Sequence, residues 1–203
     1  MSIEVKISKN RIPYKKAMFI LEKRVEDVKK GLKKEFIWIL EHPTTYTAGI
    51  RSNKNEILDK RIKVIKTNRG GKITLHSPGQ KIIYLVINLN KRKKDVRLFI
   101  NKLENSLIEL LKLYNIHAYS DKKNIGIWVN NKKISAIGVR IRNWVVYHGC
   151  SININNNLSY YKKIIPCGLS NEMVTSFNDL GISKVKNLNK NIKTIFVKNL
   201  SKI

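Results

Sequence analysis

Residues 125–154 read Ile-Gly-Ile-Trp-Val-Asn-Asn-Lys-Lys-Ile-Ser-Ala-Ile-Gly-Val-Arg-Ile-Arg-Asn-Trp-Val-Val-Tyr-His-Gly-Cys-Ser-Ile-Asn-Ile, and this stretch decides the fold class. The segment Asn130-Asn131-Lys132 suits a hairpin, because asparagine tolerates the positive φ of a tight turn. Short apolar runs of strand length lie on both sides of it, at 125–129, 133–141, 144–148 and 150–154. The stretch therefore predicts consecutive strands of one sheet.

Helix-forming sequence lies before and after this sheet region. Over residues 14–34, apolar side chains recur at intervals of 3, 4, 3 and 4 residues, which places them on one helix face: Met18, Leu21, Val25, Val28 and Leu32. A second apolar stripe predicts a helix over 96–114, and Asp95 before it is a suitable N-cap. A third helix is expected over 189–200.

Further strands are expected at 36–40, 72–76 and 81–89, with a loop at 44–52. Helices that alternate with runs of hairpin strands favour an α+β fold over a doubly wound one. We therefore predict a single domain over residues 1–203, with a mixed or antiparallel sheet and flanking helices.

The chain carries a formal net charge of +27 over 203 residues. Such a charge is typical of proteins that bind nucleic acid or acidic partners. It also results from a compositional bias, and here lysine, asparagine and isoleucine recur along the whole chain. We find neither clustered aromatics nor a basic helix, so we expect no nucleic-acid partner. A non-catalytic nucleic-acid-binding module remains an alternative that rests on the charge alone.

The cysteine content and the N-terminus indicate a cytoplasmic protein. Two cysteines do not form a disulfide framework, and no Cys/His cluster has the spacing of zinc ligands. Residues 1–16 lack the apolar run of a secretory signal, and the longest apolar runs are far shorter than a membrane span. We therefore expect no metal and no membrane partner.

Cys167 is the candidate nucleophile. It lies in Ile165-Pro166-Cys167-Gly168, where Pro166 lacks a backbone donor and Gly168 tolerates unusual conformations, so the segment is not helical. Turns present side chains to ligands, and the thiolate is the reactive form of cysteine. The alternative is a small buried apolar residue, which is the more common role of a lone cysteine.

Other segments carry candidate binding groups. In Arg69-Gly70-Gly71 the glycines let a ligand approach the backbone, and the arginine could hold an anionic group; the alternative is an ordinary turn with an exposed arginine. Lys133 opens a strand, either as a fixed cation or as a solvated surface residue. His76 and His148 stand at strand ends, where each either handles a proton, orients a ligand or is a satisfied polar residue.

Five of these motifs, in this order, resemble the lipoyl(octanoyl) transferase family: Arg69-Gly-Gly-Lys-Ile-Thr-Leu-His76, Pro78-Gly-Gln80, Lys133-Ile-Ser-Ala-Ile-Gly-Val-Arg140, Tyr147-His-Gly149 and Pro166-Cys-Gly-Leu169. Segments 41–49 and 174–181 are also similar to that family, so the resemblance covers about residues 36–181. It implies an α+β fold shared with lipoate and biotin protein ligases, and no cofactor. It also implies transfer of an octanoyl group from octanoyl-acyl carrier protein. The acceptors implied are lysines on the lipoyl domains of 2-oxoacid dehydrogenases and on the glycine cleavage H protein.

Carried over by position, the resemblance makes Cys167 the acyl-thioester nucleophile and Lys133 its partner. The sequence departs from the family's usual residues at Leu75, Ser77 and Cys150, which bears on the shape of the acyl pocket rather than on the chemistry. An ATP-dependent lipoate–protein ligase of the same fold, which would not need the cysteine, is the alternative enzyme. The substrate-binding stretches fall on Arg69, Gly70, Gly71, Lys72, Ile73, Thr74, Leu75, His76, Ala136, Ile137, Gly138, Gly149, Cys150 and Ser151.

Overall fold

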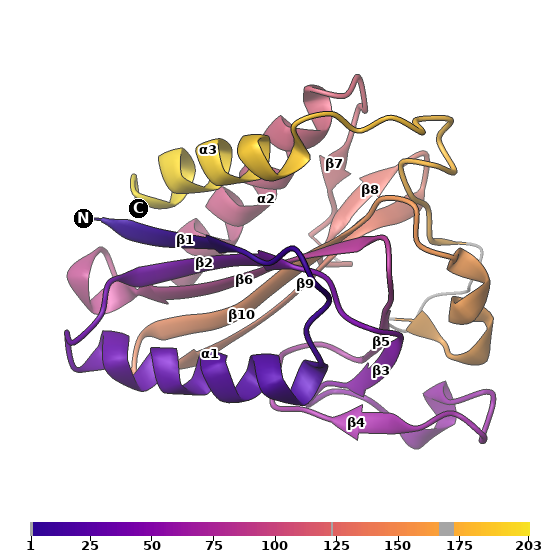
Figure 1. Ribbon diagram of the computed structural model, residues 1–203, viewed down its shortest axis with the longest axis horizontal. Helices are drawn as coiled ribbons and strands as arrows, with labels where there is room; N and C mark the ends of the chain where they lie inside the picture. The colour runs from indigo at the N-terminus through magenta and orange to yellow at the C-terminus, as the bar shows by residue number, and fades with distance from the viewer. Residues whose placement is uncertain (1, 123, 167–172) are drawn as a thin grey trace.

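The computed structural model describes residues 2–122, 124–166 and 173–203, and its centre is a seven-stranded sheet (Figure 1). In their spatial order, the strands are β1 (Ile3–Ile7), β2 (Glu35–Leu40), β6 (Gln80–Asn88), β10 (Val145–Asn153), β9 (Lys132–Arg142), β8 (Ile127–Val129) and β7 (Tyr119–Ser120). β1 pairs with β2 in parallel, and the other neighbouring strands pair antiparallel. The predicted α+β fold with a mixed sheet is therefore confirmed.

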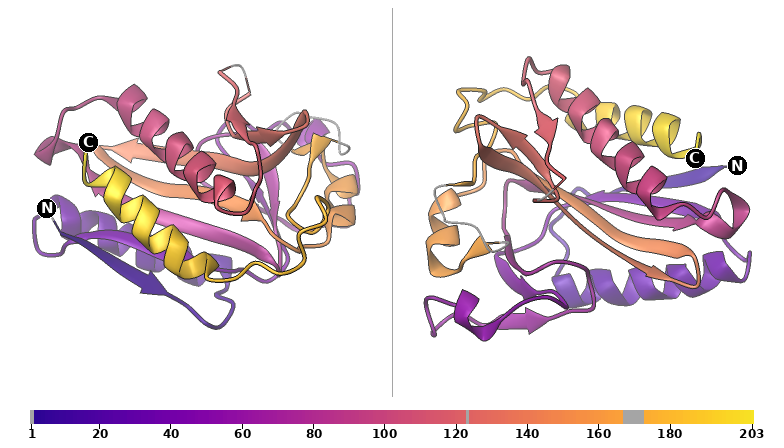
Figure 2. Two further views of the ribbon diagram at one scale, coloured as in Figure 1. Left: turned by 90° about the horizontal axis from the view of Figure 1, so that it is seen from above. Right: turned by 180° about the vertical axis from the view of Figure 1, so that it is seen from behind.

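Helices cover both faces of the sheet (Figures 1 and 2). The helix α1 (Tyr14–Lys29) lies on one face, and α2 (Val96–Lys112) and α3 (Leu188–Leu200) lie side by side on the other. α1 ends before the predicted residue 34, and Gly31 follows with a φ of +74°, the left-handed conformation that commonly follows a helix end. Among the helices in the described part of the chain, none is long and apolar enough to cross a membrane.

Two hydrophobic cores lie on the two faces of the sheet, and β6 contributes to both. Alternate residues of a strand point to opposite faces. Ile83 and Leu85 therefore pack beneath α2 and α3, while Ile82 and Val86 pack beneath α1. Burial on both sides explains why residues 82–87 are apolar without interruption.

A second, three-stranded sheet lies beside the first turn of α1 (Figure 1). Its strands, in spatial order, are β4 (Val64–Lys66), β3 (Thr45–Ala48) and β5 (Ile73–His76). The expected loop at 44–52 is wrong over its first half, because β3 is a strand that pairs antiparallel with β5 and parallel with β4. Four residues are too few for a recognisable alternation, so these distant partners, rather than the local pattern, decide the conformation.

The hairpin between β8 and β9 is confirmed. Asn130 and Asn131 have φ angles of +48° and +60°, which is the conformation that a two-residue primed turn requires. The two runs expected at 144–148 and 150–154 form the single strand β10. This strand continues through His148 although its φ is +64°, a conformation that costs a non-glycine residue about 1–2 kcal/mol.

Candidate active site

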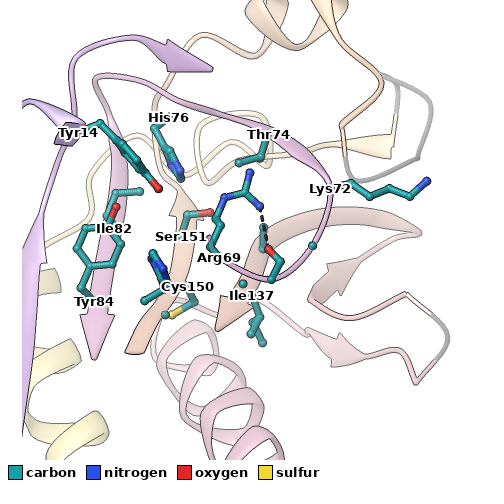
Figure 3. Close-up of a pocket in the computed structure, with 16 residues that line it drawn as sticks. Tyr14, Arg69, Lys72, Thr74, His76, Ile82, Tyr84, Ile137, Cys150 and Ser151 are labelled. Atoms are coloured by element: carbon teal, nitrogen blue, oxygen red, sulfur yellow. Dashed lines mark hydrogen bonds between the residues drawn. The ribbon is translucent and has the colours of Figure 1, made fainter. Parts of the chain in front are cut away.

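A pocket opens where β5, the loop before it, β6, β9 and β10 meet (Figure 3). Tyr14, the first residue of α1, contributes one side of it. The lining contains every predicted substrate-binding residue except Ile73 and Leu75. Its residues are Tyr14, Arg69, Gly70, Gly71, Lys72, Thr74, His76, Ile82, Tyr84, Ala136, Ile137, Gly138, His148, Gly149, Cys150 and Ser151.

Ile73 and Leu75 lie on the other side of β5. Because successive side chains of a strand point to opposite faces, Thr74 and His76 reach the pocket while their neighbours do not. Ile73 and Leu75 are fully buried in a cluster with Tyr46, which is the core of the small sheet. They therefore support the pocket wall from behind.

Three glycines allow backbone to form the pocket walls. Gly138 and Gly149 pair with each other across β9 and β10, so no side chain stands at this point of the sheet. A Cβ on Gly70 would lie 2.6 Å from the carbonyl oxygen of Val139, which shows that the loop before β5 packs directly on the backbone of β9. The result is a slot whose walls are partly bare backbone.

Arg69 is buried, with 8% of its surface exposed, so the alternative of an ordinary turn with an exposed arginine is wrong. Its Nη2 donates to the carbonyl oxygen of Thr47 at 2.7 Å and to the Thr47 hydroxyl at 2.9 Å. Its Nη1 donates to the carbonyl oxygen of Gly70 at 2.9 Å. The guanidinium therefore ties the glycine loop to β3 and fixes the shape of the pocket.

A β-bulge in β9 turns Lys133 toward the pocket side of the sheet. Trp128 pairs with Lys133, whereas the preceding Ile127 pairs with Ser135, so Ile134 is an extra residue in β9. Ile134 packs in the core beneath α2 and α3. The residue before it therefore points to the opposite face, which is the face of the pocket.

Lys133 is held in place after this turn. It is 7% exposed, so the alternative of a solvated surface lysine is wrong. Its Nζ donates to the carbonyl oxygen of Ile125 at 3.0 Å and lies 4.8 Å from the centre of the Trp128 ring. Two such contacts fix the position of the ammonium group within the site.

A second, smaller cavity lies beside the pocket, and Lys133 lines it. Pro166 lines it together with Lys133, and Cys167, the candidate nucleophile that follows Pro166, lies outside the described residues. Farther along the chain, the backbone N–H of Thr175 donates to the carbonyl oxygen of Lys133 at 3.0 Å. This cavity shares three lining residues with the larger pocket, namely Thr74, Ala136 and Ser151. The two cavities are therefore neighbours.

His148 is buried and neutral. Burial, together with the charge of Arg69, lowers its pKa to about 3. Asn68 donates from its amide nitrogen to Glu22, so its amide oxygen faces Nε2 of His148 at 2.7 Å and accepts the proton of that nitrogen. Nδ1 of His148 is then a buried acceptor, and it has no hydrogen-bond partner among the described residues.

His76 is also buried and neutral. Gln80 donates from its amide nitrogen to Asn153 and Tyr161, so its amide oxygen accepts a proton from Nδ1 of His76 at 2.9 Å. Burial lowers the pKa of His76 well below its ordinary value, and the nearby His42 adds to this effect. Neither pocket histidine is charged at neutral pH, so both are positioned to accept hydrogen bonds rather than to carry a positive charge.

Among the described residues, the one cysteine is Cys150, and its thiol is unreactive. It is 5% exposed and belongs to the core beneath α2 and α3, although its edge lines the pocket. Burial raises the pKa of its thiol far above the usual value, so it stays protonated and poorly nucleophilic. Within residues 2–122, 124–166 and 173–203, no cluster of three or more His, Cys, Asp or Glu residues could hold a metal ion.

Tyr14, Ile82 and Tyr84 line the pocket without having been expected there. Tyr14 begins α1, and the other two lie on β6 on the face beneath that helix. In the sequence they read as ordinary core residues, since nothing local distinguishes an apolar residue that faces a cavity from one that faces a neighbour. Only the packing of α1 against β6 assigns them to the site.

The lipoyl protein ligase A/B catalytic domain family matches residues 13–198 of this sequence. The chain belongs to this family. Within this lipoyl protein ligase A/B domain, the matched range begins just before α1 and extends into α3, so it includes every residue of the pocket.

Two relatives of this lipoyl protein ligase A/B domain are octanoyltransferases. The protein from Wolbachia pipientis subsp. Culex pipiens is 45% identical over 181 residues, which are 87% of this chain and 88% of that protein. The protein from Ehrlichia chaffeensis is 44% identical over 187 residues, which are 89% of this chain and 87% of that protein. At this identity and coverage, the chain is a member of the octanoyltransferases of this family.

Solved structures of the same fold include lipoate protein ligases. A structure of lipoate-protein ligase A bound with ATP has a TM-score of 0.77 and 13% identity, and the match covers 98% of this chain and 86% of that one. A bipartite lipoate protein ligase from Thermoplasma acidophilum, described with its E2 lipoyl domain, has a TM-score of 0.75 and 12% identity. That match covers 99% of this chain and 84% of the other chain. At such low identity, these likenesses confirm the fold.

Proposed function

We propose that the protein transfers an octanoyl group from acyl carrier protein to a lysine of lipoyl domains, through a thioester on Cys167. The acceptors would be the lipoyl domains of 2-oxoacid dehydrogenases and the glycine cleavage H protein, and the reaction would take place in the cytoplasm. Support comes from the two relatives of 45% and 44% identity that carry the name octanoyltransferase. The motif that contains Cys167 adds support, because it resembles the same family.

The observation that carries the proposal is the cavity that Lys133 and Pro166 line together. Cys167 follows Pro166 in the chain, and Pro166 shares this cavity with the buried, fixed ammonium group of Lys133. An ammonium about 4 Å from a thiolate stabilises it by roughly 4 kcal/mol at an effective dielectric constant of about 20. At about 1.4 kcal/mol per pKa unit, such a cation could lower the pKa of a thiol by up to about 3 units before desolvation opposes it.

The chemistry proposed has two acyl exchanges. The thiolate of Cys167 attacks the carbonyl carbon of the octanoyl thioester, the bond to the carrier sulfur breaks, and the carrier leaves as a thiolate that takes a proton from the ammonium group of Lys133. The amine of the acceptor lysine then attacks the new thioester, and the bond between carbon and the sulfur of Cys167 breaks. Lys133, which is neutral after giving its proton to the carrier thiolate, accepts the proton that the amine loses.

The adjoining pocket suits the acyl chain. An octanoyl group has roughly six methylenes to bury, which is worth about 5 kcal/mol of binding at about 0.8 kcal/mol each. The apolar side chains of Ile82 and Ile137 and the glycine backbone offer a narrow surface for such a chain. One methylene more or less is worth only about 1–3 kcal/mol, so we expect a preference for eight carbons rather than an absolute rule.

The proposal is tested by intact mass after mixing the protein with octanoyl-acyl carrier protein. We expect an octanoyl adduct on the wild type and on Cys150→Ala, and none on Cys167→Ala. An adduct that persists in Cys167→Ala would show that the nucleophile is another residue. Octanoylation of a lipoyl domain that requires ATP would favour a ligase. Submicromolar RNA or DNA binding with a steep salt dependence would favour the nucleic-acid-binding module.

A further inference from the structure

Tyr14 separates the candidate acyl pocket from a second hollow on the outside of the molecule. The outer cleft lies between α1 and the segment that contains β4. Both linings include Tyr14, which is only 3% exposed, so this residue is a partition between the two spaces. The cleft is lined by Tyr14, Lys15, Met18, Phe19, Glu22, Ile65, Lys66, Thr67 and Asn68.

The partition lies at the end of the pocket away from Lys133. The cavity of Lys133 borders the pocket at Thr74, Ala136 and Ser151, and its lining does not include Tyr14. Figure 3 shows Tyr14 across the pocket from Lys72 and Thr74. If the reacting carbonyl lies near Lys133, as the proposed function has it, the methyl end of the acyl chain points toward Tyr14.

Two neutral imidazoles flank the Tyr14 ring. It stacks on the ring of His76 with a centroid separation of 5.8 Å and an interplanar angle of 13°, and its centroid is 5.3 Å from that of His42. His42 is itself fixed, because one ring nitrogen bonds to the carbonyl of Ile12 at 2.5 Å and the other to the hydroxyl of Tyr84 at 2.8 Å. A ring held on these sides is a wall at fixed depth.

The outer cleft could accept methylenes if this wall were absent. Met18, Phe19 and Ile65 provide apolar surface on its lining, and Phe19 is 72% exposed. We propose that the Tyr14 ring is the stop that sets the acyl-chain length, and that its removal joins the pocket to the outer cleft. This inference rests on the proposed function and adds its specificity-determining residue.

The test is a series of substitutions at Tyr14, assayed with acyl carrier proteins that bear six, eight, ten or twelve carbons. Tyr14→Phe keeps the ring and should keep the preference for eight carbons. Tyr14→Leu and Tyr14→Ala should shift the preference stepwise to longer chains, and the twelve-to-eight ratio of kcat/KM should rise at least about tenfold in Tyr14→Ala. Tyr14→Trp should lower the eight-to-six ratio.

Two controls separate this stop from a general loosening of the pocket. Ile82→Ala enlarges the acyl pocket but does not border the outer cleft, so it should not improve transfer of twelve carbons. In the double variant Tyr14→Ala/Met18→Trp, the larger side chain at position 18 fills the outer cleft. This variant should therefore lose the improved transfer of twelve carbons that Tyr14→Ala shows.

Thermal unfolding identifies any variant that fails to fold, and Tyr14→Leu and Tyr14→Trp then decide the outcome. Folded Tyr14 variants that keep the wild-type chain-length profile would overturn the inference while leaving the proposed function intact. A wild-type protein that transfers no octanoyl group would instead overturn the proposed function.

Discussion

Replacing Gly149 by alanine tests whether β10 must be bare backbone at this point of the pocket wall. A Cβ at this position would lie 2.0 Å from the carbonyl oxygen of Ile83 and 3.1 Å from its carbonyl carbon. Non-bonded heavy atoms are at optimal separation near 3.5 Å, so β10 and β6 would have to separate locally by more than about 1 Å. No side-chain rotation can relieve this clash, because the opposing atoms belong to the backbone.

The expected cost combines strain and lost hydrogen bonds. Overpacking a well-packed interior costs about 1–3 kcal/mol, and each disrupted backbone hydrogen bond between the strands adds about 1 kcal/mol. We therefore expect Gly149→Ala to lower the free energy of unfolding by about 3–4 kcal/mol. Gly31→Ala is the matched control, since Gly31 has a φ of +74° and nothing within 4 Å of its added Cβ. It should cost only the backbone strain, about 1 kcal/mol.

Urea unfolding, followed by tryptophan fluorescence, measures both costs. Octanoyl transfer, assayed at urea concentrations well below the unfolding transitions of both variants, measures the effect on the site. Gly149→Ala should also transfer octanoyl groups poorly, because a separated β10 deforms the pocket wall. A loss of stability no greater than that of Gly31→Ala would refute the steric argument, and full activity would refute the link to the pocket.

Three further perturbations have defined outcomes. Lys133→Ala should shift the alkylation of Cys167 by iodoacetamide to higher pH by at least about one unit, because a nearby cation is lost; an unchanged pH profile removes Lys133 from that role. Burial lowers the pKa of His148 to about 3, so the unfolded chain binds the extra proton as the pH falls from about 6.5 toward 3. This group should therefore lower the free energy of unfolding by roughly 1.4 kcal/mol for each unit by which the pH falls in that window. In His148→Asn, whose asparagine tolerates a positive φ, the plot of unfolding free energy against pH should have a slope smaller by the equivalent of one proton. Equal slopes for the two proteins in an acid titration would contradict the assignment. Asp95 accepts a hydrogen bond from the backbone N–H of Leu98 at 2.9 Å, so Asp95→Ala should cost about 1 kcal/mol in urea unfolding, and no measurable loss would mean that this cap is dispensable.

Local patterns predicted the elements whose stabilising partners are close in the sequence. The three helices have apolar stripes with helical spacing, and the hairpin at Asn130 and Asn131 needs only residues that accept a positive φ. β1 and β3 lacked such signals. Each is short, and each is a strand because a distant segment, β2 or β5, provides its hydrogen-bond partners.

The candidate site likewise contains residues that motifs in the sequence indicated and residues that only tertiary packing brings there. The resemblance of ordered motifs to the transferase family indicated most of the pocket lining, because such motifs are visible in the sequence. Ile73 and Leu75 lie within such a motif but face the core of the small sheet, since the alternation along β5 assigns only every second residue to the pocket. Tyr14 and Tyr84 lie outside the predicted stretches and come to the pocket through the packing of α1 on β6.

By itself, the sequence determined the α+β class, the family and the residue types that the proposed chemistry requires, because these depend on spacing and identity along the chain. The tertiary structure decided where those groups point. Lys133 faces the pocket only because Ile134 is an extra residue in β9, and a register shift between two strands exists only once they are paired. Likewise, His76 and His148 are neutral because folding removes them from water, and burial is a property of the assembled core.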